Sequence, residues 1–377
     1  MVLSRSASSS RRVRDFLEEQ TKVAGLSAQL PPIRHIAREL NISTATVHHV
    51  FRDLQREGKI QTAVGRGTFW TETAATKGRR YCFGMSVAQL EYASSPLAMR
   101  IFDAIFRAST TLEQRIVLQP LATSPVNLQE WEKQLLLHRD EVDGLIMMPF
   151  PRTTTESFRK STEAFESLGK PVIAINPFEP HITQNFVSAD LLGASQRIGR
   201  AFGRAGRRRV LLVLHTSLQS SPTFAPRLMG LQLGMSEAGA HPTETVRVTF
   251  ARNVTEEAGY EIMQRELDQP PDAIYCMGDF LALGAITALR EAGLCVPEDV
   301  SVIGGTGLDF PGKQPFKLTQ FCHPVDAMAE NILRMLVERV ENDGRDLPGR
   351  YIPASFRLGD TTEEAENRIL GESLDPK

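Results

Sequence analysis

The side chains best able to do catalytic or metal chemistry are scattered along this chain. None of the four cysteines, Cys82, Cys276, Cys295 and Cys322, stands in a Cys-x-x-Cys pair. This spacing argues against a structural zinc site or a dithiol redox motif and favours buried, reduced thiols. Five histidines are equally dispersed: His138, His181, His215, His241 and His323. We therefore expect no metal and no cofactor, and assign these histidines to structural or surface positions.

Signatures of catalysis are also missing from the sequence. There is no Gly-rich phosphate loop and no nucleophile elbow. A pyridoxal-phosphate body would need a Schiff-base lysine in a Ser/Lys-rich loop, and neither Lys313 nor Lys317 lies in one. The first residues, MVLSRSASSSRRVRDF, lack the apolar run of a secretory signal, and no run of eighteen apolar residues occurs. We expect a cytoplasmic protein that is not an enzyme.

The charge is distributed unevenly along the 377 residues. The formal net charge of -2 combines a basic first 80 residues, with 14 Lys and Arg against 7 Asp and Glu, and an acidic remainder, with 29 against 38. A basic segment joined to an acidic one indicates that the first part meets a polyanion such as double-stranded DNA.

The first 71 residues have the element order of a winged helix-turn-helix. Val13, Phe16 and Leu17 form one apolar stripe, and Ile33, Ile36, Ala37 and Leu40 form a second after Pro31-Pro32. Ser43 is a good N-cap for a third helix, whose apolar stripe is Val47, Val50, Phe51 and Leu54 and whose end is Gly58. Two short strands, 59–64 and 68–71, follow around Gly65-Arg66-Gly67.

This segment resembles the GntR family of bacterial winged-helix regulators from Leu30 to Trp70. The shared features are Leu30-Pro31 with Arg34, the helix spacings, Arg56-Glu57-Gly58, and Gly65-Arg66-Gly67-Thr68-Phe69. Several fixed spacings agree at once, which makes the signal strong. The resemblance implies that the third helix enters the major groove and that the strand loop contacts phosphates or the minor groove.

The resemblance also implies which residues meet DNA. They are Arg34, Ser43, Thr44, Ala45, Thr46, His48, His49, Arg66 and Gly67. Many family members carry Arg where this chain has Thr44 and His48, so its base reading is less dominated by arginine. Simpler roles stay open: His48 and His49 as exposed helix residues, Arg66 as a solvated turn residue, and Arg34 as an ion-pair partner of Glu39 or Glu57.

Beyond a linker at 72–80, apolar strands alternate with amphipathic helices. The predicted strands are 82–87, 116–119, 144–148, 172–175, 210–214, 246–250, 273–277 and 301–303. Such alternation predicts an α/β body with parallel, doubly wound sheets. So many strands are more than one sheet usually holds, so we expect two lobes over residues 81–360. The remaining predicted parts are a basic tail at 1–12, a DNA-binding domain at 13–71 and a C-terminal tail at 361–377.

The body resembles the effector domain of LacI/GalR regulators, which is related to periplasmic sugar-binding proteins. The resemblance is closest over 272–280 (DAIYCMGDF) and 289–304 (LREAGLCVPEDVSVIG), and weaker over 142–146, 170–173, 187–190 and 227–230. It implies a ligand in a cleft between the lobes, at the carboxyl ends of the strands. Two departures, Gly278 for a frequent Asn and Gly305-Thr306-Gly307 for a frequent Phe-Asp-Asp, indicate a ligand other than an ordinary monosaccharide.

The resemblance implies the effector residues as well. They are Ser94, Ser95, Asn176, Phe224, Arg227, Asp279 and Phe280. A carboxylate accepts hydrogen bonds, a guanidinium supplies paired donors and a phenyl ring supplies an apolar wall. Simpler roles stay open here too: Asp279 as a helix cap, Arg227 as a surface ion-pair partner, and both phenylalanines as core.

Together these patterns predict a DNA-binding transcription regulator, by family analogy a repressor, that acts as a homodimer on an inverted-repeat operator. A sugar-like or nucleoside-like effector would change its operator affinity, as in arabinose-repressor-like regulators with the same two parts. The alternative is a small-molecule binding protein with no direct transcriptional role. A transport-type solute-binding protein is disfavoured because it would need a signal peptide and would lack the DNA-binding segment.

Overall fold

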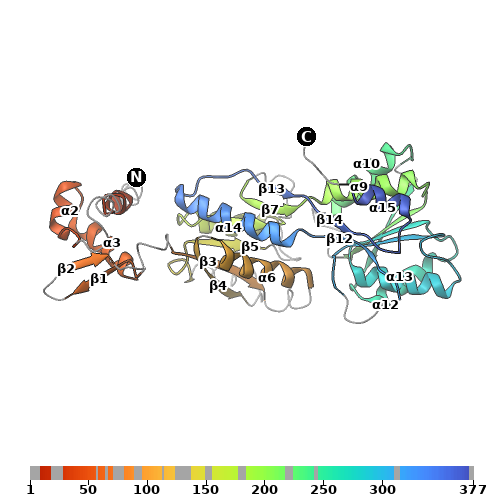
Figure 1. Cartoon of the computed structure of the whole chain (residues 1–377), viewed down its shortest axis with the longest axis horizontal. Helices are drawn as coiled ribbons and strands as arrows, with labels where there is room; N and C mark the ends of the chain where they lie inside the picture. The colour runs from red at the N-terminus through yellow and green to blue at the C-terminus, as the bar shows by residue number, and fades with distance from the viewer. Residues whose placement is uncertain are drawn as a thin grey trace. The chain divides into compact units, whose positions relative to one another are not determined.

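The computed structural model describes residues 9–17, 29–56, 58–63, 67–70, 80–88, 96–112, 114–123, 137–148, 155–176, 184–216, 224–241, 245–309 and 315–372. The chain separates into two compact units (Figure 1). The first contains Met1–Tyr81 with Leu112–Val117, and the second contains Cys82–Thr111 with Leu118–Lys377. Each unit is described by itself.

The N-terminal unit has the predicted order of helix, helix, turn, helix and hairpin. A helix over 9–17 precedes α2 (Ile33–Glu39) and α3 (Thr44–Arg56), and the antiparallel strands β1 (Ile60–Ala63) and β2 (Gly67–Trp70) follow. The apolar stripes meet in one core: Val13, Leu17, Leu30, Ile36, Ala37, Val47, Val50, Phe51, Leu54, Ile60 and Trp70. The described part of this first helix includes residues 9–12, inside the segment assigned to a tail, and the Arg12 guanidinium there donates a 3.0 Å hydrogen bond to the Leu40 carbonyl.

The turn between α2 and α3 fixes how α3 is presented. Asn41 has φ 53°, a left-handed conformation that Asn tolerates well. The Ser43 hydroxyl then accepts a 3.2 Å hydrogen bond from the Thr46 amide, satisfying one of the unpaired donors at the start of α3. At the other end, Gly58 has φ 69°, as expected of a glycine that ends a helix.

The first lobe of the body is built on a six-stranded sheet in the order β13-β7-β6-β5-β3-β4. Its strands are β3 (Arg80–Ala88), β4 (Arg115–Thr123), β5 (Gly144–Met147), β6 (Val172–Ile175), β7 (Phe186–Ala189) and β13 (Arg350–Ile352). The pairs from β13 to β3 are parallel. Helices α6 (Pro96–Thr111), α8 (Thr155–Glu166) and α14 (Val325–Glu341) belong to this lobe.

The second lobe repeats this plan with the order β14-β12-β11-β10-β8-β9. Its strands are β8 (Val210–His215), β9 (Val246–Ala251), β10 (Ala273–Cys276), β11 (Ser301–Gly304), β12 (Thr319–Cys322) and β14 (Ser355–Arg357). Every pair is parallel except β12 with β14. Its helices are α9 (Leu191–Arg204), α10 (Phe224–Glu237), α12 (Glu256–Glu266), α13 (Asp279–Glu291) and α15 (Glu364–Leu370). The predicted α/β fold with two parallel sheets is confirmed.

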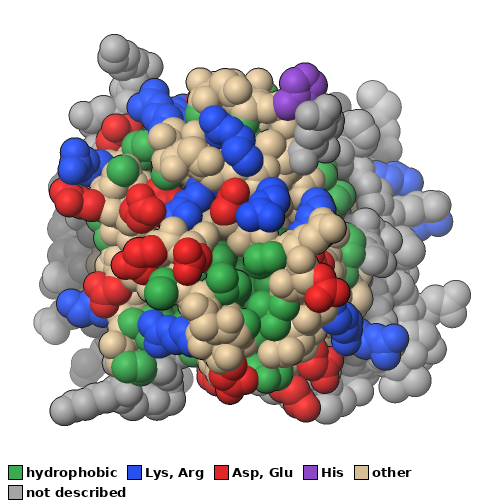
Figure 2. Space-filling view, turned by 90° about the vertical axis from the view of Figure 1, so that its right-hand side faces the viewer, with side chains coloured by type: hydrophobic (Ala, Val, Ile, Leu, Met, Phe, Trp, Pro, Cys, Tyr) green, Lys and Arg blue, Asp and Glu red, His purple; other side chains and the backbone are tan. Residues whose placement is uncertain are grey.

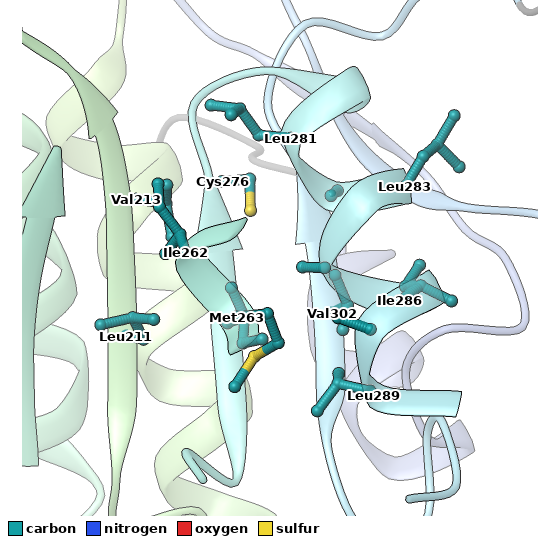
Figure 3. Close-up of a cluster of buried hydrophobic side chains, with 14 of the residues drawn as sticks. Leu211, Val213, Ile262, Met263, Cys276, Leu281, Leu283, Ile286, Leu289 and Val302 are labelled. Carbon is teal, nitrogen blue, oxygen red and sulfur yellow. The ribbon is translucent and has the colours of Figure 1, made fainter. Parts of the chain in front are cut away.

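One buried cluster forms the core of the second lobe beside α13, the helix that begins with Asp279. Val213, Cys276 and Val302 face Ile262 of α12 and Leu281 of α13 in one buried cluster (Figure 3). Burying each large apolar side chain contributes about 1.5 to 3 kcal/mol. Helices α12 and α13 pack closely because Gly284 has no side chain, and a Cβ there would lie 1.8 Å from the Glu256 carbonyl oxygen.

The chain crosses between the lobes three times, at residues 189–191, 322–325 and 352–355, because β7, β12 and β13 each lead into an element of the other lobe. All three crossings use strands that the sequence did not predict, because 186–189, 319–322 and 350–352 lie outside the predicted strands. Residues 361–372, assigned to a tail, also belong to the body in the structure: Thr361 and Glu366 are fully buried, and Glu366 accepts a 2.6 Å hydrogen bond from Ser301 of β11.

Candidate DNA-binding and effector sites

The polar edge of α3 is the candidate surface for reading DNA bases. Val47 and Val50 face the core, while Thr44, His48 and His49 are exposed. The exposed Ala45 and the half-buried Thr46 lie in the same first turn, and the hydroxyls of Thr46 and Ser43 are 2.8 Å apart. Donors and acceptors on one side of an accessible helix are what base recognition in the major groove requires.

The two histidines of this edge differ in whether a neighbouring side chain holds them. The His49 imidazole lies 3.6 Å from the Asp53 carboxylate one turn further along α3. No hydrogen bond or ion pair joins His48 to the part of the chain that the structure describes. His48 is therefore the better placed of the two to meet a base, and His49 is held beside a carboxylate.

Arg34 is exposed on the first turn of α2. The predicted alternative, an ion pair with Glu39, is not formed: Glu39 instead lies 3.1 Å from the His35 imidazole. Glu57, the other alternative partner, lies outside the described residues. Arg34 makes no contact of this kind with described residues, which leaves its guanidinium available to a phosphate.

The strand hairpin is attached to α3 by side chains. The Gln55 amide donates a 2.8 Å hydrogen bond to the Thr62 hydroxyl, which is 3.2 Å from that of Thr68. Gly67 has φ 108°, a backbone conformation that favours glycine, and a Cβ there would have to displace the end of the Gln29 side chain. Arg66, the predicted phosphate contact, lies outside the described residues.

Asp279 is the centre of a polar arrangement in the second lobe. It begins α13, but Gly278 is the N-cap and no side chain caps the helix, so the helix-cap alternative is not observed. Its fully buried carboxylate accepts hydrogen bonds from the Leu308 amide at 2.8 Å, the Thr306 amide at 3.2 Å and the Thr306 hydroxyl. Asp279 therefore organises the loop 305–308, which replaces the Phe-Asp-Asp of the resembling family.

The other predicted effector residues occupy several surroundings. Arg227 is 5% exposed, so it is not a surface ion-pair partner, and its charge is felt by His323. The Phe224 ring is 6.0 Å from that of Phe250, and Phe280 packs against the core cluster of the second lobe. Phe280 is thus placed more as core than as a ligand wall.

Asn176 is held at the end of β6 in a left-handed conformation with φ 45°. Its side-chain oxygen accepts hydrogen bonds from the Ser188 hydroxyl at 3.0 Å and the Ala189 amide at 3.3 Å. These contacts join the ends of two neighbouring strands immediately before the first crossing between lobes. Ser94 and Ser95 lie outside the described residues.

The sequence reasoning missed two side chains at the crossings, His323 and Arg100. A pocket of about 460 Å³ is lined by both. His323 follows β12 and is 6% exposed, and neither ring nitrogen has a hydrogen-bond partner in the described part of the chain. Burial, then the charges of Arg227 and Arg100, lower the pKa of His323 to about 3, so its ring is neutral near pH 7.

Arg100 connects the two lobes at this pocket. From α6 of the first lobe, its guanidinium donates to the carbonyls of Thr306 at 2.8 Å and Gly307 at 3.0 Å in the second. The only sequence signal for these two residues was position: one follows a buried strand before a proline, and the other lies in the first turns of an amphipathic helix. Neither fits a motif.

The described residues contain neither a cluster of possible metal ligands nor a helix that could span a membrane. No three His, Cys, Asp or Glu side chains there gather closely enough to hold a metal ion. None of the helices in the described ranges has the length and apolar character needed to cross a membrane. On one face of the second lobe, acidic and basic side chains are interspersed around hydrophobic ones, without a continuous basic surface (Figure 2).

Comparison with known families accounts for both parts of the chain. Residues 20–69 match the family described as bacterial regulatory proteins, gntR family, and residues 200–362 match the periplasmic binding protein-like domain. The chain is therefore a transcription regulator that joins a GntR-type DNA-binding domain to a periplasmic-binding-protein-like domain.

Individual relatives agree with this class. The chain is 27% identical over 320 residues to the HTH-type transcriptional repressor PurR of Escherichia coli O139:H28, covering 82% of this chain and 90% of the repressor. The PurR of Salmonella paratyphi A is equally similar, with the same coverage. These relatives are transcriptional repressors rather than enzymes.

Solved structures show the same fold. A LacI family regulator from Enterococcus faecium with bound ribose has a TM-score of 0.60 at 20% identity, covering 74% of this chain and 98% of that one. The lac repressor dimer bound to operator and the anti-inducer ONPF has a TM-score of 0.61 at 17% identity, covering 77% and 96%. The structure of this chain is thus that of LacI-type regulators, preceded by a GntR-type head.

Proposed function

We propose that this protein is a repressor whose affinity for its operator is controlled by a small molecule bound between the lobes of its body. The observation that carries the proposal is the exposed polar edge of α3, on a helix placed by a GntR-type head. The relatives support it, because PurR is a repressor and the lac repressor structure contains operator DNA.

The head would read DNA with α3 in the major groove. Thr44, Ala45, Thr46 and His48 would face base edges, with Ser43 and His49 beside them. Arg34, Arg66 and Gly67 would contact the phosphate backbone, which sets affinity and orientation but not sequence. We place the DNA-binding domain at residues 9–71, so that it includes the described first helix, and the linker at 72–80.

The effector would lie near Arg227 and Asn176, with Phe224, Phe280, Ser94 and Ser95 as further candidate contacts. Asp279 would act by shaping the loop 305–308. A ligand that binds one arrangement of the lobes better than another shifts the population toward it. A coupling of about 1 to 3 kcal/mol corresponds to roughly a 5- to 150-fold change in operator affinity. We place the effector-binding body at residues 81–372, because residues 361–372 pack into its second lobe.

The proposal includes a homodimer acting in the cytoplasm. Two heads in a symmetric dimer contact half-sites about one DNA turn, roughly 34 Å, apart or a multiple of it, so the operator would be an inverted repeat. A sugar-like or nucleoside-like effector is the first class to test, since one structural neighbour, a LacI family regulator, was solved with bound ribose.

The experiment is a titration of the purified chain against fluorescent DNA from its own upstream region, at fixed salt, with and without sugars and nucleosides. We expect tight binding to an inverted repeat and a shift in affinity with one compound. Absence of DNA binding under every condition would contradict the proposal and favour the alternative, a small-molecule binding protein without a direct role in transcription.

A further inference from the structure

The pocket at the crossings between lobes contains more positive charge than its own carboxylates neutralise. Its lining includes Arg100, Arg357 and Asp326. Arg357 pairs with Asp309 at 2.8 Å, and Asp326 pairs with Arg107 at 2.7 Å. Arg100 donates to two backbone carbonyls and, within the described residues, reaches no carboxylate. Among the residues that the structure describes, Arg100 therefore has no ion-pair partner at the pocket.

His323 provides a second, independent indication that a ligand is missing from this pocket. Its ring is almost fully buried, in edge contact with Phe321 at 4.7 Å between centroids, and it lines the pocket. Both ring nitrogens lack a partner among the described residues. A buried polar group without a hydrogen bond is destabilising, so native structures seldom leave one without a partner.

We propose that this pocket binds the anionic group, a carboxylate or a phosphate, of the effector, with Arg100 as its counter-charge and His323 as a hydrogen-bonding contact. This inference rests on the proposed function and narrows the class of effector. A guanidinium matches the two oxygens of either anion, and a neutral imidazole can donate one hydrogen bond to the anion and accept another from a neighbouring hydroxyl.

The location gives this contact a regulatory consequence. Arg100 lies on α6 of the first lobe, and the carbonyls it binds lie in the second-lobe loop that Asp279 organises. An anion at Arg100 would compete with, or add to, that cross-lobe hydrogen bond. Ligand binding at this point therefore acts directly on the contact between the lobes.

The test is calorimetric titration of the full chain with inorganic phosphate, and with glucose, glucose 6-phosphate and gluconate, at constant ionic strength set with chloride. We expect saturable binding of phosphate or gluconate, and at least a tenfold preference for a charged sugar over glucose. The phosphate ester and the carboxylate distinguish the two sources of the anion.

Arg100→Gln and His323→Asn should each weaken the charged ligand at least tenfold. Arg159→Gln and His138→Asn are matched controls, because Arg159 and His138 are more exposed residues paired with Glu163 and Glu141 in the first lobe. Controls should bind as the wild type does. Equal affinity of Arg100→Gln and wild type, or no saturable binding of any anion, would overturn the inference.

The same titrations separate this inference from the proposed function. If only neutral compounds change operator affinity, the proposed regulatory function is supported and the proposed anion site is wrong. If anions bind as described but the chain binds no DNA, the proposed anion site is supported and the proposed regulatory function is wrong. Both readouts use one preparation of the full chain, so a folding defect would appear in both.

Discussion

At the scale of single residues, the candidate site residues of the body differ in how many of their hydrogen bonds are already made within the protein. The carboxylate of Asp279 is fully used by the loop 305–308, whereas the imidazole of His323 has no partner in the described residues. Asp279 could be predicted as a candidate site residue from the sequence because it lies in a family motif. His323 could not, because whether a side chain lacks hydrogen bonds depends on its folded surroundings and is not encoded in residue spacing.

Replacing Asp279 with Asn should destabilise the body and abolish the effector response. Asn keeps one acceptor oxygen but cannot receive hydrogen bonds at both oxygens, which leaves a buried N–H or hydroxyl unsatisfied at a cost of about 1 to 3 kcal/mol. Urea unfolding and DNA titration with effector are the measurements. Asp309→Asn is the control, since Asp309 is highly exposed on the same loop and should change stability by no more than about 0.5 kcal/mol. Equal stability of both variants would contradict the role given to Asp279.

Arg66 gives a residue-scale prediction for the head. Arg66→Ala should weaken operator and nonspecific DNA by a similar factor, because a phosphate contact does not depend on sequence. The slope of log affinity against log salt concentration is negative, and its magnitude should decrease by about 0.9, the value for one phosphate contact. Binding measured from low to moderate salt supplies the slope, and an unchanged slope would rule out the phosphate contact.

At the scale of elements, helix periodicity predicted the head well. Its buried stripe of Val47, Val50 and Leu54 was read correctly from spacing, and so were the strand pair and the glycine that ends α3. The crossings between lobes were not predicted. Strands β13 and β14 have three residues each, too few to show alternation, and β14 pairs antiparallel at the edge of a parallel sheet. Long-range pairing, rather than local pattern, decides such short strands.

Helix α15 should make the stability of the body depend on pH through Glu366. Glu366 is fully buried, and burial raises its pKa despite hydrogen bonds from Ser301 and Arg207. The folded state then binds a proton that the unfolded state has released, so the free energy of unfolding falls as pH rises from about 4.5 through the folded pKa of Glu366. In Glu366→Gln this contribution should vanish. Urea unfolding at several pH values tests it, and identical pH slopes for variant and wild type would refute it.

At the scale of the whole molecule, we propose that one chain has two recognition surfaces, one for DNA and one for the effector, and that binding at each changes affinity at the other. The basic first 80 residues and the acidic remainder were visible in the sequence, as was the fold class of each part. The identity of the effector was not, because it depends on which polar groups the three crossings bring together. Reciprocity is the thermodynamic signature of such coupling: DNA must change effector affinity by the same factor by which effector changes DNA affinity.

The most direct test is to measure effector affinity by calorimetry in the absence of DNA and again with saturating operator. Operator should change effector affinity by roughly 5- to 150-fold, and by the same factor as the effector changes operator affinity in the reverse titration. A nonspecific duplex of equal length should have a smaller effect. An effector affinity that is unchanged by saturating operator would show that the two sites are independent, and would contradict the central claim.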